Sequence, residues 1–238
     1  MDLLALNPGE ELLDMGCATG TLAIPLARAG HRVHGCDFAE AMLAILDERA
    51  GAENLPITSH LLAWEDDWEA VGFGPNSVDA AFASRSLMSG DVFSAVRKLD
   101  SAARSWAAVV VPGSSLPSRD PRILTYLGRS TRRPRIVRDV TRALAALGRV
   151  PIFATTQTFR PMRFSSFGEA RSDLRRLAGP EPFTAREHRL FDAYAAQHFV
   201  RRAAEFPSGK PSEMWVLDYK LPVTWVFIGW RADGSTWA

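Results

Sequence analysis

The chain has 238 residues, of which 47% are hydrophobic and 23% charged, the composition of a globular protein with enough apolar material for a core. Its 28 Lys and Arg and 27 Asp and Glu leave a net charge of +1, which argues against a histone-like protein or an acidic tail. The sequence has no apolar run of about 18 residues that would predict a membrane span, and its start lacks the basic segment of a signal peptide. We therefore expect a cytoplasmic protein.

Neither a disulfide framework nor a metal site is expected. Cys17 and Cys36 are the only cysteines, and their spacing fits neither a zinc site nor a redox pair, so we expect reduced thiols. His31 and His34 are close in sequence, but residues three apart on a strand point to opposite faces of a sheet.

Strands and helices alternate through the first half of the chain. A short apolar strand at Glu11–Met15 runs into a glycine-rich turn at 16–20 and then a helix that ends near Ala29. Asp37 and Glu40 have the spacing of a capping box that opens a second helix, which runs to about Ala50. The remaining elements predicted here are strands at Arg32–Cys36, Ile57–Leu62, Val78–Ala83 and Ala107–Val111 and a helix at Val92–Ala103. This alternation predicts an α/β fold with a parallel, doubly wound sheet.

The second half is less regular. It has predicted helices at Pro121–Leu127 and Arg135–Leu147 and predicted strands at Ile152–Thr158 and Val223–Trp230. Between the last two strands, Ser166 with Glu169 and Thr184 with Glu187 have capping-box spacings, which predict two further helices. No Gly/Ser linker divides the chain.

The glycine-rich turn predicts a cofactor site. A strand, a glycine turn and a helix place backbone N–H groups and the positive end of a helix dipole at the carboxyl edge of a sheet, where nucleotide-like cofactors bind. A dehydrogenase fingerprint would have glycines where Ala18 and Thr21 stand, and a P-loop would have a lysine that Gly20-Thr21-Leu22 lacks.

What remains is a resemblance to a methyltransferase. Residues 14–20, DMGCATG, resemble motif I of the class I S-adenosylmethionine-dependent methyltransferases, usually D/E-x-G-x-G-x-G, with Ala18 at the central glycine. Residues 37–43, DFAEAML, are similar to the family's D-x-S-x-x-M-L, with Ala39 in place of the serine. The resemblance implies a mostly parallel, seven-stranded Rossmann-like sheet with an antiparallel last strand, a helical insertion before that strand, and S-adenosylmethionine as cofactor.

The resemblance also implies cofactor contacts. Asp14 would support the turn and approach the methionine amino group, and Asp37 would hold the ribose hydroxyls. The case for Asp37 also has a physical basis that does not depend on the family, because a carboxylate at the end of the second strand can accept hydrogen bonds from two vicinal hydroxyls. The alternative for Asp37 is a simple helix N-cap. The other contacts implied in these two motifs are Gly16, Cys17, Ala18, Thr19, Gly20, Phe38 and Met42.

Two loops would complete the cofactor site. Ala63 stands where the family often has an aspartate, so Glu65 or Asp66 would contact the adenine, with Trp64 stacking nearby; a solvated acidic turn is the alternative. Ser84 and Arg85 follow the fourth strand, where the family places residues that contact the methionine part of the cofactor and the acceptor. Arg85 could also bind a carboxylate or phosphate, or pair with Asp91 at the surface.

No catalytic base is predicted, because methyl transfer from a sulfonium needs positioning and water exclusion more than acid–base groups. Arg85, Tyr126, Tyr194 and His198 are candidates for acceptor contact, and His60 is a further candidate by residue type. For the histidines and tyrosines, packing or surface roles are the alternative.

We expect one class I methyltransferase domain over 1–238, with a cofactor-binding half at 1–111 and substrate or lid segments at 112–134 and 159–221. Aromatic residues in the second segment suit a pocket lid or a helical hairpin that covers the sheet: Phe183, Phe191, Tyr194, Phe199, Phe206 and Trp215. Only 13 residues precede Asp14, so the cofactor cap would be lost by truncation, come from a partner as in a homodimer, or come from the insertion.

The predicted function is methyl transfer to a small-molecule acceptor. The alternatives are an RNA (tRNA or rRNA) methyltransferase and a cofactor-binding homologue without turnover. RNA would be favoured by a basic cluster of Arg129, Arg132, Arg133, Arg135, Arg138 and Arg142. Arg135, Arg138 and Arg142, however, lie on one side of a helix whose other side is apolar, the pattern of any solvated amphipathic helix.

Overall fold

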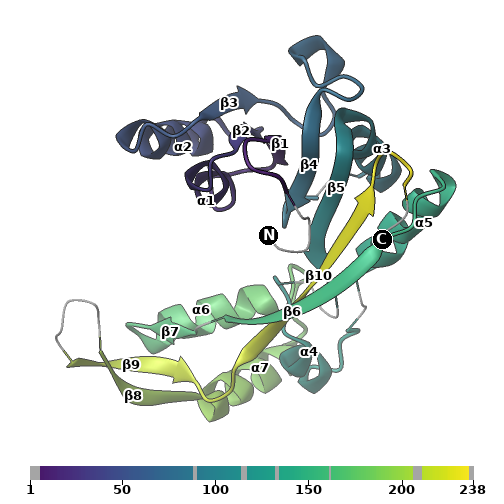
Figure 1. Ribbon diagram of the computed structural model, residues 1–238. Helices are drawn as coiled ribbons and strands as arrows, with labels where there is room; N and C mark the ends of the chain where they lie inside the picture. The colour runs from purple at the N-terminus through teal and green to yellow at the C-terminus, as the bar shows by residue number, and fades with distance from the viewer. Residues whose placement is uncertain are drawn as a thin grey trace. The chain divides into compact units, whose positions relative to one another are not determined.

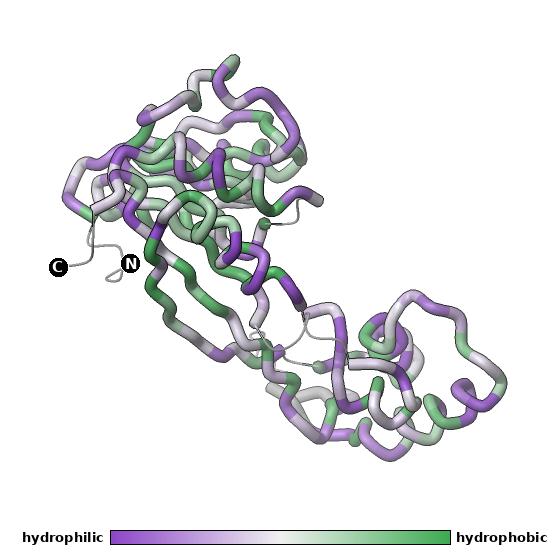
Figure 2. The backbone as a smooth tube through the Cα atoms, turned by 90° about the vertical axis from the view of Figure 1, so that its right-hand side faces the viewer, coloured by the Kyte–Doolittle hydropathy of each residue, from purple (hydrophilic) through white to green (hydrophobic). Residues whose placement is uncertain are grey.

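The protein divides into two compact units. The computed structural model describes residues 6–87, 90–113, 117–131, 134–160, 162–205 and 211–235. Unit 1 comprises residues 1–111, 135–155 and 226–238, and unit 2 comprises 112–134 and 156–225. Hydrophobic and hydrophilic stretches alternate along the backbone of both units (Figure 2).

A seven-stranded sheet has the strand order β3-β2-β1-β4-β5-β10-β6 (Figure 1). Its strands are β1 (Glu11–Met15), β2 (Arg32–Asp37), β3 (Ile57–Leu61), β4 (Val78–Ser84), β5 (Ala103–Pro112), β6 (Ile152–Arg160) and β10 (Leu221–Arg231). Strands β1 to β5 pair in parallel, and β10 lies antiparallel between β5 and β6. The predicted Rossmann-like sheet with its antiparallel last strand is therefore confirmed.

Helices cover both faces of this sheet in unit 1. Leu12 of β1 packs in a core with α1 (Ala23–Arg28) and α2 (Glu40–Ala52), whereas Leu13 packs in a second core with α3 (Val92–Ala102) and α5 (Ile136–Ala146). Successive residues of a strand are buried on opposite faces, as a doubly covered parallel sheet requires. A short 3₁₀ helix, η2 (Glu69–Val71), follows β3. No helix in the described ranges is long and apolar enough to cross a membrane.

Unit 2 has its own hydrophobic core. It contains α4 (Pro121–Tyr126), α6 (Phe167–Leu177) and α7 (Ala185–His198), together with a three-stranded antiparallel sheet of order β7-β9-β8. The strands are β7 (Arg163–Phe164), β8 (Phe199–Glu205) and β9 (Pro211–Leu217). The two predicted helices of the insertion are confirmed, but the three strands were not expected. Of the aromatic residues predicted for a lid, Phe206 lies outside the described residues.

The helix starts show which capping boxes form. Thr184 and Glu187 form the predicted box, because each side chain accepts the backbone N–H of the other residue. Ser166 caps α6 through the N–H of Glu169, whereas the carboxylate of Glu169 accepts from Ser165 instead of Ser166.

The box predicted for Asp37 and Glu40 is wrong. The N-cap of α2 is Ala39, with no side-chain cap, so Glu40 is the first residue of the helix and not the third residue after the cap, as the box requires. The two oxygens of Asp37 accept the N–H groups of Ala18 and Ala39.

Candidate functional site

The carboxyl edge of four neighbouring strands brings the predicted cofactor residues together. In the parallel register Met15 of β1 lies beside Cys36 of β2, and Asp14 lies beside Phe82 of β4, so these strands end at the same edge. All the predicted cofactor residues follow or end these strands in unit 1: Asp14, Gly16, Cys17, Ala18, Thr19, Gly20, Asp37, Phe38, Met42, Trp64, Glu65, Asp66, Ser84 and Arg85.

Close packing explains two glycines of the turn after β1. A Cβ on Gly16 would lie 2.1 Å from the Cβ of Ser86, and a Cβ on Gly20 would lie 2.5 Å from Cδ1 of Leu46. Both residues also have a positive φ, +76° and +86°. The middle position, Ala18, has a φ of +47°, a left-handed conformation that costs a non-glycine residue about 1 kcal/mol. The alanine therefore fits the turn, but under backbone strain.

The turn is bonded to the end of β2. The N–H groups of Gly16 and Cys17 both donate to the carbonyl of Cys36, at 2.7 and 3.0 Å. The Cys17 side chain is buried in the core, and burial raises the pKa of its thiol above the usual range. Only the backbone of Cys17 therefore takes part in the turn, and its buried side chain stays a neutral thiol.

Asp37 links the two motifs. It is 6% exposed; Oδ2 accepts from the N–H of Ala18 at 2.9 Å and Oδ1 from the N–H of Ala39 at 3.0 Å. Since a carboxylate oxygen can accept two hydrogen bonds, both oxygens keep capacity for the hydroxyls of a ribose. The simple N-cap alternative is excluded, because Ala39 is the N-cap of α2.

Asp14 lies in the buried part of β1. It is 2% exposed, and burial raises the pKa of its carboxyl to about 7, with the charge of Asp37 adding to the rise and the N–H of Ala23 opposing it. A carboxyl with this pKa changes its charge near neutral pH and ionises more readily when a cation binds beside it.

The loop after β3 is held by its own polar groups. Asp66 Oδ2 accepts the N–H of Ala63 at 2.7 Å, and Lys98 Nζ donates to the carbonyls of Trp64 and Asp66 at 2.7 and 2.6 Å. The indole N–H of Trp64 donates to the carbonyl of Ser86 at 3.0 Å, which ties this loop to the one after β4. Asp66 thus stabilises the turn, and Glu65 is exposed beside it.

Apolar side chains are exposed at the same edge. Phe38 is 77% exposed and Met42, in the first turn of α2, is 42% exposed. Large apolar groups next to a polar turn are typical of a surface that a ligand covers. Arg85, after β4, is exposed and has a φ of +62°, and its N–H donates to the carbonyl of Val110 at 2.9 Å. Strained backbone of this kind gathers at functional sites.

Three of the acceptor candidates form one cluster in unit 2. The rings of Tyr126 and Tyr194 lie 5.0 Å apart, and those of Tyr194 and His198 lie 4.2 Å apart. His198 Nδ1 lies 3.0 Å from Oδ1 of Asp218. Arg85 and His60 belong to unit 1 and are not members of this cluster.

The cluster has two members that sequence reasoning missed. The hydroxyls of Tyr194 and Tyr219 lie 2.8 Å apart, and Tyr219 donates to the carboxylate of Asp120, which is completely buried. Asp120 and Tyr219 are 99 residues apart. The only local signal was the position of Asp120 before Pro121, which is typical of a helix N-cap.

The predicted basic cluster is divided between the units. Arg129 lies in unit 2 with 14% of its side chain exposed, and its Nε donates to Glu187 at 2.6 Å. Arg135, Arg138 and Arg142 lie exposed at or on α5 in unit 1, with Val140 and Leu144 buried behind them. Arg132 and Arg133 lie outside the described residues. The described arginines therefore do not form one continuous surface on a single unit.

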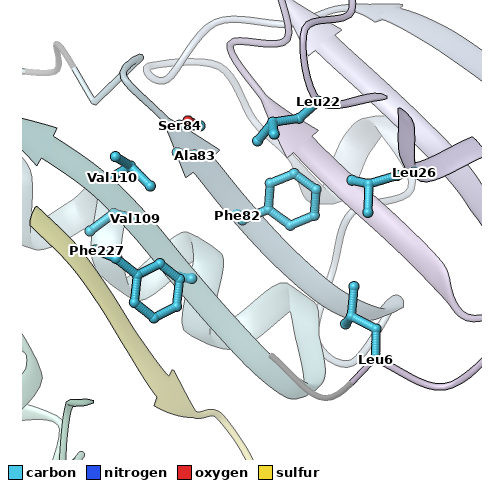
Figure 3. A pocket seen from close by; sticks show the side chains of 10 residues that line it. Leu6, Leu22, Leu26, Phe82, Ala83, Ser84, Val109, Val110 and Phe227 are labelled. Carbon is cyan, nitrogen blue, oxygen red and sulfur yellow. The ribbon is translucent and has the colours of Figure 1, made fainter. Parts of the chain in front are cut away.

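A separate pocket of about 160 Å³ lies in unit 1 between α1 and β10 (Figure 3). It is lined by Leu6, Leu22, Leu26, Phe82, Ala83, Ser84, Ala108, Val109, Val110 and Phe227, so Ser84 has the one polar side chain in the lining. Small-molecule sites commonly measure about 300 Å³ or more. The pocket suits an apolar group and not a charged cofactor. In the described part of the chain, no three His, Cys, Asp or Glu side chains are arranged to hold a metal.

Comparison with known proteins identifies the domain. Residues 12–113 match a protein family described as a methyltransferase domain. A demethylmenaquinone methyltransferase from Corynebacterium kroppenstedtii is 32% identical over 112 residues, which cover 46% of this chain and 41% of that protein. A 23S rRNA (uracil(1939)-C(5))-methyltransferase from Alkalilimnicola ehrlichii is 35% identical over 79 residues, which cover 31% of this chain and 18% of that protein. The chain thus matches less than half of the length of these relatives.

The fold agrees over a longer stretch. The crystal structure of the YcgJ protein from Bacillus subtilis superimposes with a TM-score of 0.58 at 14% identity, over 97% of this chain and 94% of that one. Residues 12–113 thus match a methyltransferase domain, and the likeness to the YcgJ structure shows that the two proteins share a fold.

Proposed function

We propose that the protein transfers the methyl group of S-adenosylmethionine to a small-molecule acceptor. The observation that carries this proposal is the joint position of the glycine turn, Asp14 and Asp37 at one sheet edge in unit 1. Asp14 would bind the amino group of the cofactor and Asp37 its ribose hydroxyls. Phe38, Met42 and Trp64 would cover the adenine, with Glu65 near its amino group.

The cofactor supplies an activated leaving group, so the work of the chain is to bind and orient both reactants and to exclude water. Ser84 and Arg85 would lie nearest to the methionine part, because Ser84 ends β4, the strand next to β1, and Arg85 follows it. Unit 2, which contains the whole of the segments 112–134 and 159–221, would supply the acceptor contacts Tyr126, Tyr194 and His198.

The described members of the predicted arginine cluster give no single basic surface on either unit that would favour RNA. In the arginine cluster that would favour RNA, Arg129 forms an ion pair with Glu187 inside unit 2. The exposed members of that cluster that the structure describes lie at or on α5 in unit 1. Binding of a structured RNA relies on several phosphate contacts along one basic surface.

Calorimetric titration with S-adenosylhomocysteine tests the cofactor site. We expect micromolar or tighter binding to the native chain and a loss of at least about tenfold in Asp37→Ala, which removes the acceptor for the ribose hydroxyls. Asp47→Ala is the matched control, because Asp47 is an exposed carboxylate on α2 that contacts Ser59. Failure of folded protein to bind would refute the proposal.

Turnover is tested separately with cofactor labelled in its methyl group and an extract of small metabolites. Labelled product in the small-molecule fraction supports the proposal. Label only in RNA would identify the alternative acceptor, and binding without any labelled product would identify a homologue that does not turn over.

A further inference from the structure

The near-neutral net charge of the chain hides a strong division between its units. Unit 2 contains 16 Lys and Arg and 9 Asp and Glu, whereas unit 1 contains 12 and 18. Unit 2 thus carries a formal charge of +7 and unit 1 a charge of −6, which together give the +1 of the chain. A positively charged unit attracts anionic ligands.

The acidic residues of unit 2 do not offset this charge at its surface. Every carboxylate of unit 2 whose side chain is described already has a partner in that unit: Asp120, Glu169, Asp173, Glu181, Glu187, Asp192, Glu213 and Asp218. Within the described ranges, five exposed arginines of unit 2 have no carboxylate within ion-pair distance: Arg122, Arg163, Arg186, Arg189 and Arg202. The surplus positive charge therefore faces solvent.

Arg122 differs from the other four because it lies at the cluster formed by Tyr126, Tyr194 and Tyr219. Its guanidinium carbon is 4.2 Å from the centre of the Tyr219 ring, a stacked position that holds the side chain and leaves its N–H edge open. Tyr126 follows one helical turn later on α4 and is 42% exposed, with its ring against Tyr194. Residues four apart on a helix share a face, so the guanidinium and the Tyr126 hydroxyl lie on the same side of α4.

Buried groups fix these two side chains. Asp120 accepts the backbone N–H of Arg122 through Oδ1 at 2.9 Å and the hydroxyl of Tyr219 through Oδ2. The Tyr219 hydroxyl donates its one hydrogen bond to Asp120. In the 2.8 Å contact between the two tyrosine hydroxyls, Tyr194 must therefore be the donor and Tyr219 the acceptor. The protons of both buried hydroxyls are thus used, whereas the Tyr126 hydroxyl has no hydrogen bond to any described residue.

We propose that Arg122 and Tyr126 form an anion-binding pair that holds a phosphate or carboxylate group of a small-molecule ligand. A guanidinium can donate two parallel hydrogen bonds to such a group, and the phenol can donate a third. The binding of an anion at this pair is independent of the proposed methyl transfer.

Tyrosine signals in an NMR spectrum test the pair directly. The chain has three tyrosines, and Tyr126, Tyr194 and Tyr219 all belong to this cluster, so every signal from ¹³C-labelled tyrosine reports on it. The probes are inorganic tripolyphosphate and a 20-nucleotide single-stranded RNA. We expect tripolyphosphate to shift the Tyr126 signals in a saturable way, without S-adenosylmethionine.

Matched variants locate the effect. In Arg122→Gln we expect binding of tripolyphosphate to weaken by about tenfold or more, because a charge-assisted pair of hydrogen bonds is lost. Arg189→Gln removes the same charge from the same unit, on α7, and should change the affinity by less than about twofold. Tyr126→Phe should weaken binding less than Arg122→Gln does.

Two results would overturn the proposal. The first is a tyrosine spectrum that tripolyphosphate leaves unchanged, or changes equally in the chain with Arg122→Gln. The second is a response to RNA without a response to tripolyphosphate, which would exclude a small anion as the ligand. Binding of S-adenosylhomocysteine, measured on the same samples, shows separately whether the cofactor site is intact.

Discussion

Asp37 accepts the backbone N–H of Ala18, with 2.9 Å between the nitrogen and Oδ2. The bond joins the end of β2 to the middle of the glycine turn, at the residue whose φ is +47°. The buried carboxylate thereby supports a conformation that alanine seldom adopts.

Ala18→Gly should raise the free energy of unfolding by about 1 kcal/mol, because glycine adopts a positive φ without steric cost. It should also tighten binding of S-adenosylhomocysteine, since the cofactor can approach the backbone more closely. Urea unfolding and calorimetry measure the two effects. Ala44→Gly, an exposed position within α2, is the control and should lower the free energy of unfolding by about 1 kcal/mol. A loss of stability in Ala18→Gly would contradict the prediction.

Asp14 should make stability fall as the pH rises. The pKa of its carboxyl is about 7 in the folded protein, against an ordinary value of 3.8 for an aspartate in the unfolded chain. Between these two values the unfolded chain has lost a proton that the folded chain keeps. The free energy of unfolding therefore decreases towards pH 7, by up to about 1.4 kcal/mol per pH unit from this group. Asp14→Asn should remove this slope, as measured by urea unfolding from pH 5 to pH 8.

The same group predicts proton release on cofactor binding. A positively charged amino group beside Asp14 favours its ionised form, so binding near pH 6.5 should release a proton. Calorimetry in two buffers of different ionisation enthalpy measures the number of protons released on binding. An identical binding enthalpy in both buffers would show that Asp14 does not ionise.

His60 should have the opposite effect in acid. Its Nε2 lies 3.0 Å from Nδ1 of His34, and burial together with the neighbouring imidazole holds the pKa of His60 below 6.5. As the pH falls through 6.5 the unfolded chain binds a proton first, so the free energy of unfolding decreases. His60→Gln keeps a donor but cannot titrate, and should weaken this acid sensitivity. His188→Gln, an exposed position on α7, should leave it unchanged.

The three tyrosines should differ in their contribution to stability. Tyr219→Phe removes a donor from the buried carboxylate of Asp120 and should cost about 1–3 kcal/mol of the free energy of unfolding. Tyr194→Phe removes the bond to Tyr219 and should cost about 1 kcal/mol, and Tyr126→Phe, at an exposed hydroxyl, close to none. Urea unfolding followed by circular dichroism gives the order. Equal losses would contradict the proposed direction of the hydrogen bonds.

Much of unit 1 could be predicted because its signals are local. The strand at Glu11–Met15, the glycine turn and the following helix are adjacent in sequence, and their order is enough to place the cofactor edge. The capping box at Asp37 failed because the helix begins at Glu40, two residues later than the box requires, while the Asp37 carboxylate accepts the N–H of Ala18, 19 residues away. Spacing alone cannot show either fact.

Unit 2 was harder to predict for two physical reasons. Strand β8, with the sequence FVRRAAE, lacks the alternation of apolar and polar residues that marks a strand, and β7 has only two residues. The cluster around Tyr194 depends on Asp120 and Tyr219, which only the folded chain brings together. Net charge was also misleading, because it sums two units of opposite sign.

The contact between positions 16 and 86 has a consequence for the evolution of this chain. A side chain at 16 would occupy the space of the Ser86 Cβ, only 2.1 Å away, while Ser86 itself donates a hydrogen bond to the carbonyl of Met15. Position 16 can accept a larger residue only if position 86 loses its side chain or the turn opens. Related sequences should therefore show correlated substitutions at these two sites, and a single change at either one should be rare.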